Sequence, residues 1–394
     1  MDRSSPFPLK LYLESVVDIL DALNYDDQNY ARPERVKTLQ YVYSETAKHF
    51  SQPYQQELLK VSPKKLAAAM RTATNVTVCC WVKVAKEVMV AISIYWVYII
   101  FLDDSNKDPS LQMSSFVPDL LGGNQQKHPF WRLVAGHLPD FLSHYGGFCS
   151  LAIIRSTLDY FQGCWIETRN FQGYEGSRYY PGFLRRLNGL GGICGGSLFP
   201  AAQYDENKLF NEITTVIAQI EPIATLVNDL FSFYKEYECP RDEISLITNY
   251  CHVEGKSFQD AFERLTADTV GCIEQLKSTF DRTKTPAVSD AMYAFAHGYM
   301  TWHMCDERYR MHEVYDQCGN SPVERKFRQY YEAAVNAGKI DIQVWPAFLA
   351  TDNGVKSQVS AEATTEKLVS CYGLDTQEQG TTGSDTDVGP CCDG

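Results

Sequence analysis

The sequence predicts an all-α domain over residues 1–350, followed by a polar C-terminal tail over residues 351–394. Apolar residues recur at the i, i+3 and i+4 spacing of helices that bury one face. Strict alternation of apolar and polar residues, which is typical of half-buried strands, is scarce. No internal repeat and no Pro/Gly-rich linker divides the chain. Its 394 residues, of which 44% are hydrophobic, are enough for one large core.

The individual elements follow from this pattern along the chain. Helical periodicity predicts helices at 34–50, 63–70, 88–102, 221–231, 258–280 and 289–304. Turn-forming residues predict loops at 105–110, 122–129 and 171–182. Beyond residue 350 large apolar side chains become rare, so we expect the tail to be largely disordered.

Charge and cysteine content argue against several classes of protein. The formal net charge is −13 and no cluster of Lys or Arg stands out, so we expect no nucleic-acid partner. An anionic substrate would need local cations or metal ions against this background. The 13 cysteines form no paired C-x-x-C set, which argues against zinc. The N-terminus lacks a signal-type apolar core, so we expect a cytoplasmic protein.

One apolar segment, residues 88–102, tests whether the chain crosses a membrane. Its 15 residues fall short of the roughly twenty that a bilayer-spanning helix needs. The segment ends directly in two carboxylates, Asp103 and Asp104. We therefore expect a buried central helix and no membrane span.

A polar stripe interrupts the apolar pattern in the sequence NDLFSFYKE at 228–236. Asn228, Ser232 and Glu236 lie at i, i+4 and i+8, so they share one helical face, and Lys235 lies on the same stripe. Their oxygens suit a hard cation such as Mg²⁺, which proteins hold through one or two carboxylates, substrate phosphates and water. A solvent-facing polar strip is the alternative, and the spacing alone leaves both interpretations open.

The carboxylates that end the segment 88–102 form a second candidate element. Negative charge at a helix C-terminus opposes the helix dipole, and a bound cation would offset this cost. Ile99 and Trp96 share the face of Asp103, which places this carboxylate at the rim of an apolar, aromatic wall. The alternative is an ordinary helix end that enters the polar turn at 105–110.

The third element is the sequence GYMTWHMCDERYR at 298–310. A continuous helix through it places one aromatic stripe on a single face: Phe295, Tyr299, Trp302, Asp306 and Tyr309. Such stripes belong to a core more often than to a catalytic site. Arg308 falls off this face, so only a bent or frayed helix end would bring it to the same site.

Taken in this order, the three elements resemble the trichodiene synthase family, a fungal branch of the class I sesquiterpene cyclases. The pattern N-D-x-x-S-x-x-x-E is typical of class I terpene cyclases. The segments RSTLDYFQGCWIE, FLRRLNGLGG and HGYMTWHMCDERYR resemble this branch in particular. The resemblance extends from about Asn24 to about Trp345, and neither the extreme N-terminus nor the polar tail shares it.

The resemblance implies a class I terpenoid synthase helix bundle around a central active-site cavity. It implies farnesyl diphosphate as substrate, three Mg²⁺ ions as cofactor, and a homodimer. Asp103 would bridge two of the metal ions, and the third would be bound by Asn228, Ser232 and Glu236. The groups that would bind diphosphate are Arg185, Lys235, Arg308 and Tyr309, with Tyr299 nearby. Asp104 would pair with Arg308 when the site closes.

Two departures from the family leave the product open. The acidic motif usually reads D-D-x-x-D, whereas here Lys107 stands at the fifth position and Asp108 follows it. Trp96 stands where trichodiene synthases have Tyr. We therefore expect trichodiene or a related skeleton, and keep as alternatives an alcohol such as longiborneol and a catalytically degenerate isoprenoid-binding protein. A chain-elongating isoprenyl enzyme would carry a second aspartate-rich motif in place of NDLFSFYKE.

Overall fold

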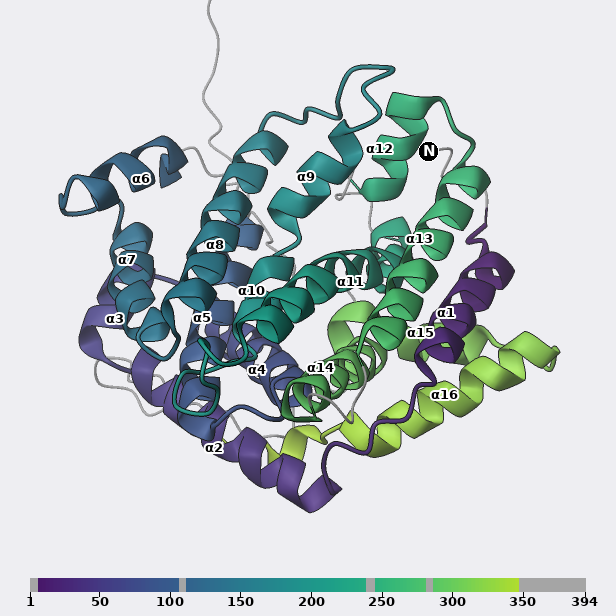
Figure 1. Ribbon diagram of the computed structural model, residues 1–394, viewed down its shortest axis with the longest axis horizontal. Helices are drawn as coiled ribbons and strands as arrows, with labels where there is room; N and C mark the ends of the chain where they lie inside the picture. Colours follow the sequence, from purple (N-terminus) through teal and green to yellow (C-terminus); the bar gives the residue numbers. More distant parts are fainter. Residues whose placement is uncertain (1–5, 106–110, 239–244, 281–285, 347–394) are drawn as a thin grey trace, which may run out of the picture. The chain divides into compact units, whose positions relative to one another are not determined.

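The computed structural model describes residues 6–105, 111–238, 245–280 and 286–346, and these residues form an all-α fold, as predicted (Figure 1). No β-strand occurs in the described part of the chain. These residues lie within a compact unit, Met1–Lys356. The boundary near residue 350 and the disordered tail stay predictions, because residues 347–394 lie outside the description.

The helices of the N-terminal part include all those predicted there. The segments 34–50, 63–70 and 88–102 fall in α2, α4 and α5, although α4 continues ten residues further than expected. The bounds are α1 Leu9–Leu23, α2 Arg32–Phe50, α3 Pro53–Leu59, α4 Pro63–Cys80, α5 Lys86–Ser105, α6 Met113–Leu121, α7 Pro129–Leu142 and α8 Gly147–Glu167.

The C-terminal part contains the two other central helices of the prediction, α11 and α14. The loop expected at 171–182 ends earlier, because α9 already begins at Tyr180 with Pro181 in its first turn. The bounds are α9 Tyr180–Asn188, α10 Gly191–Gly196, α11 Phe210–Glu238, α12 Leu246–Glu254, α13 Phe258–Thr279, α14 Pro286–Cys305, η2 Glu307–Tyr309, α15 Met311–Gln317, α16 Pro322–Gly338 and η3 Ile342–Val344.

Local sequence explains where many of these helices begin. Proline in the first turn follows an extended residue in α2, α3, α4, α7 and α16, where its fixed φ suits the helix and its missing N–H costs nothing. Ser321 and Glu324 form a reciprocal capping box at the start of α16. The Ser62 and Ser257 hydroxyls accept bonds from backbone N–H groups at the start of α4 and α13.

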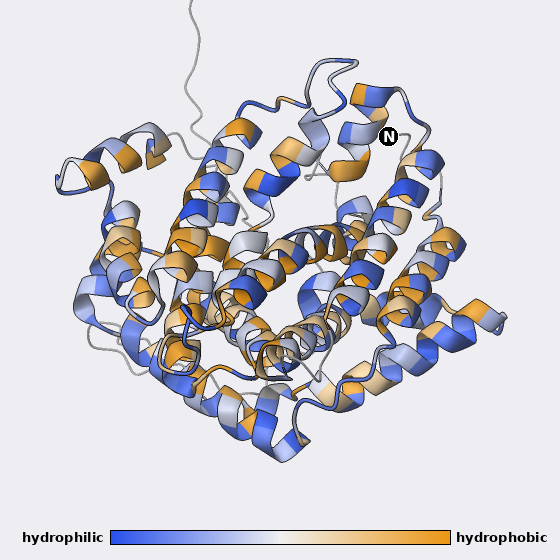
Figure 2. Ribbon diagram, in the orientation of Figure 1, coloured by the Kyte–Doolittle hydropathy of each residue, from blue (hydrophilic) through white to orange (hydrophobic). Residues whose placement is uncertain are grey.

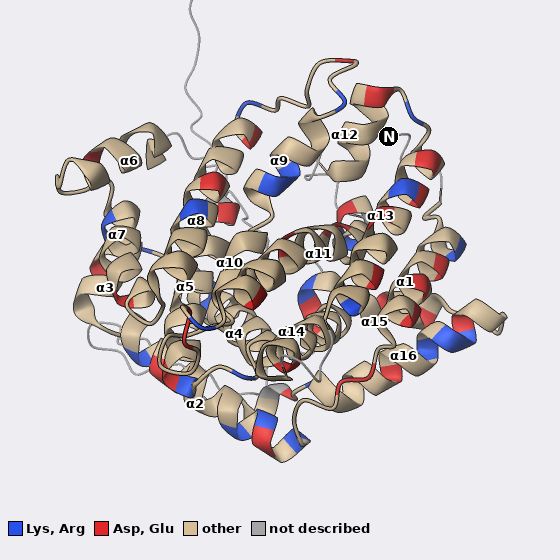
Figure 3. Cartoon of the chain, viewed as in Figure 1, with Lys and Arg blue, Asp and Glu red and all other residues tan. Residues whose placement is uncertain are grey.

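Helices α5, α11 and α14 lie in the interior and carry the three candidate elements. Helix α5 packs on α2, α4 and α7, whereas α11 packs on α10, α13 and α14 (Figure 1). Figure 2 shows hydrophobic residues along these central helices, and Figure 3 shows most of α14 without acidic or basic residues. The predicted buried helix at 88–102 is confirmed, because Ile92, Tyr95 and Val97 are almost fully buried.

Helix α14 comes unusually close to α4 at Gly298. A Cβ atom at this position would lie 1.8 Å from the Cys79 carbonyl oxygen, far below any tolerated contact. Only glycine therefore permits this spacing between the two helices. This spacing therefore helps to determine where Tyr299, Trp302 and the C-terminal end of α14 lie relative to α4.

One described helix, α11, is long and apolar enough to pass a test for membrane spans by length and composition. However, 67% of its most apolar window is buried inside the protein. Core helices of folded domains are buried in this way, so we interpret α11 as the central helix of the bundle.

Candidate active site

The polar stripe on α11 does not face solvent. Ser232 is 3% exposed, and Asn228, Lys235 and Glu236 are partly buried. Within the stripe, Asn228 contacts Arg185 on α9 and Tyr309 on the turn η2. A fully solvated strip is therefore not what this helix shows, because Ser232 is buried and the Asn228 amide has partners on two other elements.

Asn228 is fixed by hydrogen bonds at both ends of its amide. Its Oδ1 atom accepts from Nη2 of Arg185 at 3.1 Å. Its Nδ2 atom donates to the Tyr309 hydroxyl at 3.0 Å and lies 3.3 Å from Nε2 of His303. Burial lowers the pKa of His303 to about 3, so its imidazole is neutral. A side chain with this many partners has one orientation.

Arg185, on α9, is bound tightly to α11. Its Nε donates to Oδ2 of Asp229 at 2.5 Å, and Nη2 also donates to the Thr225 carbonyl oxygen at 3.1 Å. Burial acts to lower the pKa of Arg185, but the Asp229 carboxylate, together with Tyr299 and Glu236, acts in the opposite direction, and the pKa is raised. Burial raises the pKa of Asp229, although Arg185 opposes this. Arg185 is therefore a fixed cation beside the stripe.

The end of α14 differs from the predicted continuous helix. The helix ends at Cys305, and Asp306 caps the separate turn η2, where its Oδ1 accepts from the Arg308 N–H at 3.0 Å. The Asn75 amide on α4 donates to Oδ2 of Asp306 at 2.9 Å, which holds the cap in place. The expectation that Asp306 and Tyr309 continue the helical face of Phe295 was wrong, because the chain bends at this cap.

This bend brings Arg308 to the acidic end of α5. Its Nη2 atom lies 3.2 Å from Oδ2 of Asp103, and the Tyr160 hydroxyl donates to Oδ1 of Asp103 at 3.3 Å. The Asp103 side chain is 45% exposed, so it is the most accessible of the candidate metal-binding groups. Sequence periodicity placed Arg308 away from the site, and the bent helix end corrects this.

Adjacent residues of η2 thus connect the two predicted metal-binding elements. Arg308 reaches Asp103 on α5, and Tyr309 reaches Asn228 on α11. The Glu236 carboxylate also acts electrostatically on both Arg185 and Tyr309. Residues that are far apart in the sequence therefore form one connected polar cluster.

An aromatic group lies beside this cluster. The Tyr299 hydroxyl donates to the Ala224 carbonyl oxygen on α11 at 2.8 Å, and the Tyr299 ring packs edge-on against His303. Trp302 packs edge-on against Tyr309 with ring centroids 5.0 Å apart. On α5, Trp96 contacts Trp81 and Tyr95, and its indole N–H is buried without a hydrogen-bond partner among the residues described.

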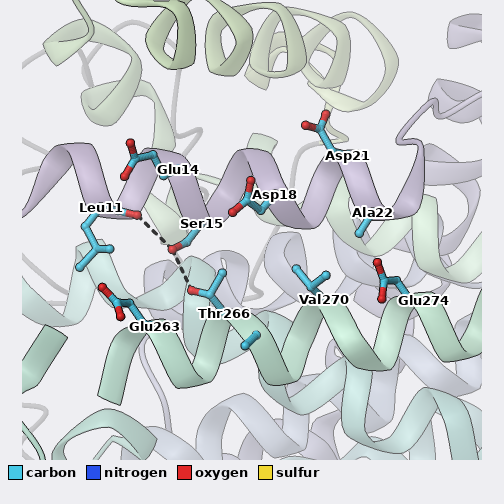
Figure 4. A pocket seen from close by; sticks show the side chains of 11 residues that line it. Leu11, Glu14, Ser15, Asp18, Asp21, Ala22, Glu263, Thr266, Val270 and Glu274 are labelled. Atoms are coloured by element: carbon cyan, nitrogen blue, oxygen red, sulfur yellow. Dashed lines mark hydrogen bonds between the residues drawn. The ribbon is translucent and has the colours of Figure 1, made fainter. Parts of the chain in front are cut away.

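Two surface hollows in the described part of the protein lie away from this cluster. The larger, of about 700 Å³, lies between α1 and α13, where Ser15 and Thr266 form a hydrogen bond across the helices (Figure 4). The other is formed by 176–180. Neither contains a predicted site residue, so the central cavity remains a prediction.

The comparison with known protein families decides the assignment. Residues 6–377 match the family model described as Trichodiene synthase (TRI5). The chain belongs to the trichodiene synthase family. It is therefore a sesquiterpene cyclase, and the resemblance found in the sequence motifs is confirmed. The match begins before Asn24 and extends past Trp345, so the limits expected from the sequence were too narrow.

Relatives in the trichodiene synthase family match most of the chain. Trichodiene synthase of Stachybotrys chartarum is 49% identical over 341 residues, which cover 86% of this chain and 89% of that protein. Terpene cyclase pbrA of Penicillium brasilianum is 48% identical over 348 residues, which cover 88% of this chain and 85% of that protein. These two differently named relatives are equally similar, so identity does not select between them.

The fold of the trichodiene synthase family is also found among solved structures. Linalool/nerolidol synthase from Streptomyces clavuligerus, in complex with 2-fluorogeranyl diphosphate, aligns with a TM-score of 0.51 and 12% sequence identity. The alignment covers 66% of this chain and 94% of that chain. This similarity confirms the predicted class I terpenoid synthase fold.

Membership of the trichodiene synthase family implies a divalent metal, and the donors present suit one. The described residues contain no group of three or more His, Cys, Asp or Glu placed to bind a metal ion. The candidate set instead combines carboxylates with amide and hydroxyl oxygens, which is the all-oxygen chemistry that Mg²⁺ prefers. The fixed amide of Asn228 and the accessible carboxylate of Asp103 fit such an ion.

The sequence motifs missed two residues of this site. Asp229 follows Asn228 directly but lies on the neighbouring flank of α11, where it binds Arg185. His303 lies in the aromatic stretch of α14, where its ring packs against Trp302 and Tyr309. The only signal in the sequence was the presence of a histidine among these aromatic residues. The predicted partner of Arg308, the Asp104 side chain, and the altered acidic motif with Lys107 and Asp108 lie outside the described part of the structure.

Proposed function

We propose that this sesquiterpene cyclase ionises and cyclises farnesyl diphosphate with Mg²⁺, and releases diphosphate with trichodiene or a related skeleton. The observation that carries the proposal is the turn η2, whose adjacent residues Arg308 and Tyr309 contact Asp103 and Asn228. This arrangement supports a site in which two metal-binding elements and two diphosphate-binding groups act on the same ligand.

The metal assignment follows the family pattern. Asp103 would bind two Mg²⁺ ions, and Asn228, Ser232 and Glu236 would bind the third. When bound, the ions stabilise the negative charge that develops on diphosphate as the C–O bond breaks. Ser232 is buried and Glu236 partly buried, which supports their service to a ligand in the interior rather than to bulk solvent.

Cationic side chains would complete the recognition of diphosphate. Arg185 is preorganised by Asp229 and Thr225, so little ordering is needed when an oxyanion binds. Lys235 has no ion-pair partner among the described residues, which leaves its ammonium available beside Glu236. Arg308 and the Tyr309 hydroxyl would donate from η2.

Cyclisation needs a dry, shaped and electron-rich surrounding. Water would quench the allylic cation early, so an apolar wall that excludes it protects the reaction. Aromatic faces stabilise positive charge. Tyr299 and Trp302 offer such faces beside the polar cluster, and Trp96 offers another on α5, where it packs against Trp81. Trp96 is the residue that we expect to shape the product, because it shares the helical face of Asp103.

The proposal includes a cytoplasmic homodimer without a nucleic-acid partner, which sizing by light scattering and fractionation of cells would test. Loss of activity is the competing proposal, and only the altered acidic motif supports it. The connected cluster opposes it, because Asp103, Arg308, Tyr309, Asn228 and Arg185 form a continuous chain of contacts.

The decisive experiment is incubation of the purified protein with farnesyl diphosphate, with and without Mg²⁺, followed by gas chromatography–mass spectrometry. A single Mg²⁺-dependent cyclic product is expected, and its mass spectrum distinguishes a hydrocarbon from an alcohol. An absence of cyclic products from both farnesyl and geranyl diphosphates would favour the degenerate protein. Full turnover by Glu236→Ala would contradict the assignment of the third metal.

A further inference from the structure

The amide of Asn228 can serve a metal ion from only one of its two ends. Oδ1 is an acceptor with two lone pairs, whereas Nδ2 is a donor that a cation repels. The two ends have nearly the same shape, so packing alone does not choose between them. The choice depends on the hydrogen-bonding groups around the amide.

His303 supplies the group that selects the orientation. Its Nδ1 atom lies 2.7 Å from the Tyr299 carbonyl oxygen, and because a carbonyl oxygen only accepts, Nδ1 carries the proton. Nε2 lies 3.3 Å from Nδ2 of Asn228, an atom that only donates, so Nε2 is the acceptor in this contact. The His303 ring therefore accepts from the amide nitrogen.

A reversed amide would be disfavoured on both sides. It would turn Oδ1 toward the lone pair of His303 Nε2, and Nδ2 toward the Arg185 guanidinium, which has only donors. The observed orientation instead matches each donor with an acceptor. Its Oδ1 atom stays on the side of Arg185, where the proposed diphosphate and metal would bind.

The imidazole is held firmly enough to act as this selector. His303 is fully buried, with rings around it from α11, α14 and η2. The ring centroids of Tyr299, Tyr309 and Trp302 lie 4.3, 4.4 and 4.6 Å from that of His303. Rotation of the imidazole would break the bond to Tyr299 and disturb this packing.

We propose that His303 is a positioning residue for metal binding, which holds the Asn228 amide with Oδ1 directed toward the metal and Nδ2 directed away. The inference rests on the proposed role of Asn228 as a metal ligand. Groups that orient a metal ligand typically change metal affinity about 10- to 100-fold when they are replaced.

A matched pair of variants separates this role from packing. His303→Gln places its amide near the position of Nε2 and keeps an acceptor for Asn228. His303→Asn places its amide near the position of Nδ1 and keeps only the bond to Tyr299. Calorimetric titration of the full-length protein with inorganic diphosphate and Mg²⁺ should show the required Mg²⁺ concentration raised about 10- to 100-fold in His303→Asn, and less than about 5-fold in His303→Gln.

Two further variants keep the outcomes distinct. His137, a buried histidine whose Nε2 bonds to the Ala91 carbonyl oxygen, is the control, and His137→Asn should leave the Mg²⁺ requirement unchanged. Asn228→Ala tests the assumption beneath the inference. If it leaves the Mg²⁺ requirement unchanged, the metal assignment is wrong. Suppose that Asn228→Ala instead raises the Mg²⁺ requirement, while the two His303 variants have the same Mg²⁺ requirement as the native protein, or the same requirement as each other. In that case only the proposed role of His303 is refuted.

A measurement on the native protein needs no variant to fold. Nitrogen NMR of histidine-labelled protein reports which ring nitrogen carries the proton. The inference requires a neutral His303 with the proton on Nδ1, both before and after addition of Mg²⁺ and diphosphate. A proton on Nε2 would point a donor at Asn228 and would overturn the proposal.

Discussion

Two arginine–aspartate pairs flank the candidate metal-binding residues, and they differ in burial and in partners. In the pair of Arg185 and Asp229 the side chains are 15% and 11% exposed and the atoms lie 2.5 Å apart. In the pair of Arg308 and Asp103 the exposures are 22% and 45% and the distance is 3.2 Å. Arg185 has further acceptors on α11, whereas Asp103 has solvent on one side.

The difference in burial and partners indicates that the two ion pairs have different roles. Arg185 is held by the Asp229 carboxylate and the Thr225 carbonyl oxygen, so we expect this pairing to persist and to keep the cation in a fixed place. Asp103 is a proposed metal ligand, so its bond to Arg308 must be exchangeable. An exposed pair contributes little to stability, and this small contribution makes the exchange inexpensive.

The largest expected effect comes from removing a metal-binding carboxylate. Asp103→Ala and Glu236→Ala should each lower turnover of farnesyl diphosphate roughly a thousandfold, which is about 4 kcal/mol of lost charge stabilisation. The thermal unfolding midpoint of Asp103→Ala should barely change, because nearly half of the Asp103 side chain is exposed. Steady-state kinetics by product release, with the surface variant Glu45→Ala as control, would check this.

The second effect tests the permanence of the buried pair. Asp229→Asn should lower the free energy of unfolding by about 3 kcal/mol, since it leaves the Arg185 charge buried without its carboxylate. Chemical denaturation would measure this. The double variant Arg185→Gln/Asp229→Asn should lose less than the sum of the single variants, because it leaves no orphan charge. Strict additivity would mean that the two side chains do not act as a pair.

The third effect is the dependence of the unfolding free energy on pH that arises from one buried histidine, His137. Burial lowers the pKa of His137 from its ordinary value of 6.5 to about 4. The unfolded chain therefore binds the proton more readily, and stability is lost as the pH falls from 6.5 toward 4. At pH 5 the cost relative to pH 7 is about 2 kcal/mol.

The variant His137→Phe should remove this part of the pH dependence. Its unfolding free energy should fall less steeply between pH 7 and pH 5 than that of the native protein. The His49 ring packs against His137, and burial lowers the pKa of His49 to about 4 as well. The unfolding free energy of the variant should therefore still fall with pH, although less steeply. Identical slopes for the variant and the native protein would show that His137 titrates normally.

The smallest expected effect concerns the exposed pair. Arg308→Gln should change the free energy of unfolding by less than about 1 kcal/mol. Added salt should reduce even this difference, since exposed charges are screened. Urea titrations at low and high salt would measure it. A loss as large as that of Asp229→Asn would mean that the two pairs do not differ as described.

The sequence predicted those features that depend on local periodicity. The buried helix at 88–102 and the helical stripe from Asn228 to Glu236 both follow from residue spacing, and they lie within α5 and α11. The end of α14 could not be predicted in this way, because a side-chain cap at Asp306 and a contact with Asn75 on another helix determine it. Tertiary contacts of this kind leave no periodic signal.

The roles of Asp229 and His303 were hidden for a related reason. Asp229 stands beside a recognisable motif but points to a different partner, and its meaning depends on where α9 places Arg185. His303 reads as one more ring in an aromatic helix until its two nitrogens are assigned to separate acceptor and donor groups. Both residues act through a neighbour, and the neighbour is known only from the fold.

The close approach of α14 to α4 at Gly298 has a consequence for changing the product of this enzyme. Because residue 298 has no methyl group, the backbones of α14 and α4 can approach closely here. Positions on this helix therefore fall into two groups for protein engineering. Substitutions at Tyr299 or Trp302 would change single rings beside the proposed site, whereas a substitution at Gly298 would push the two helices apart and shift these rings together.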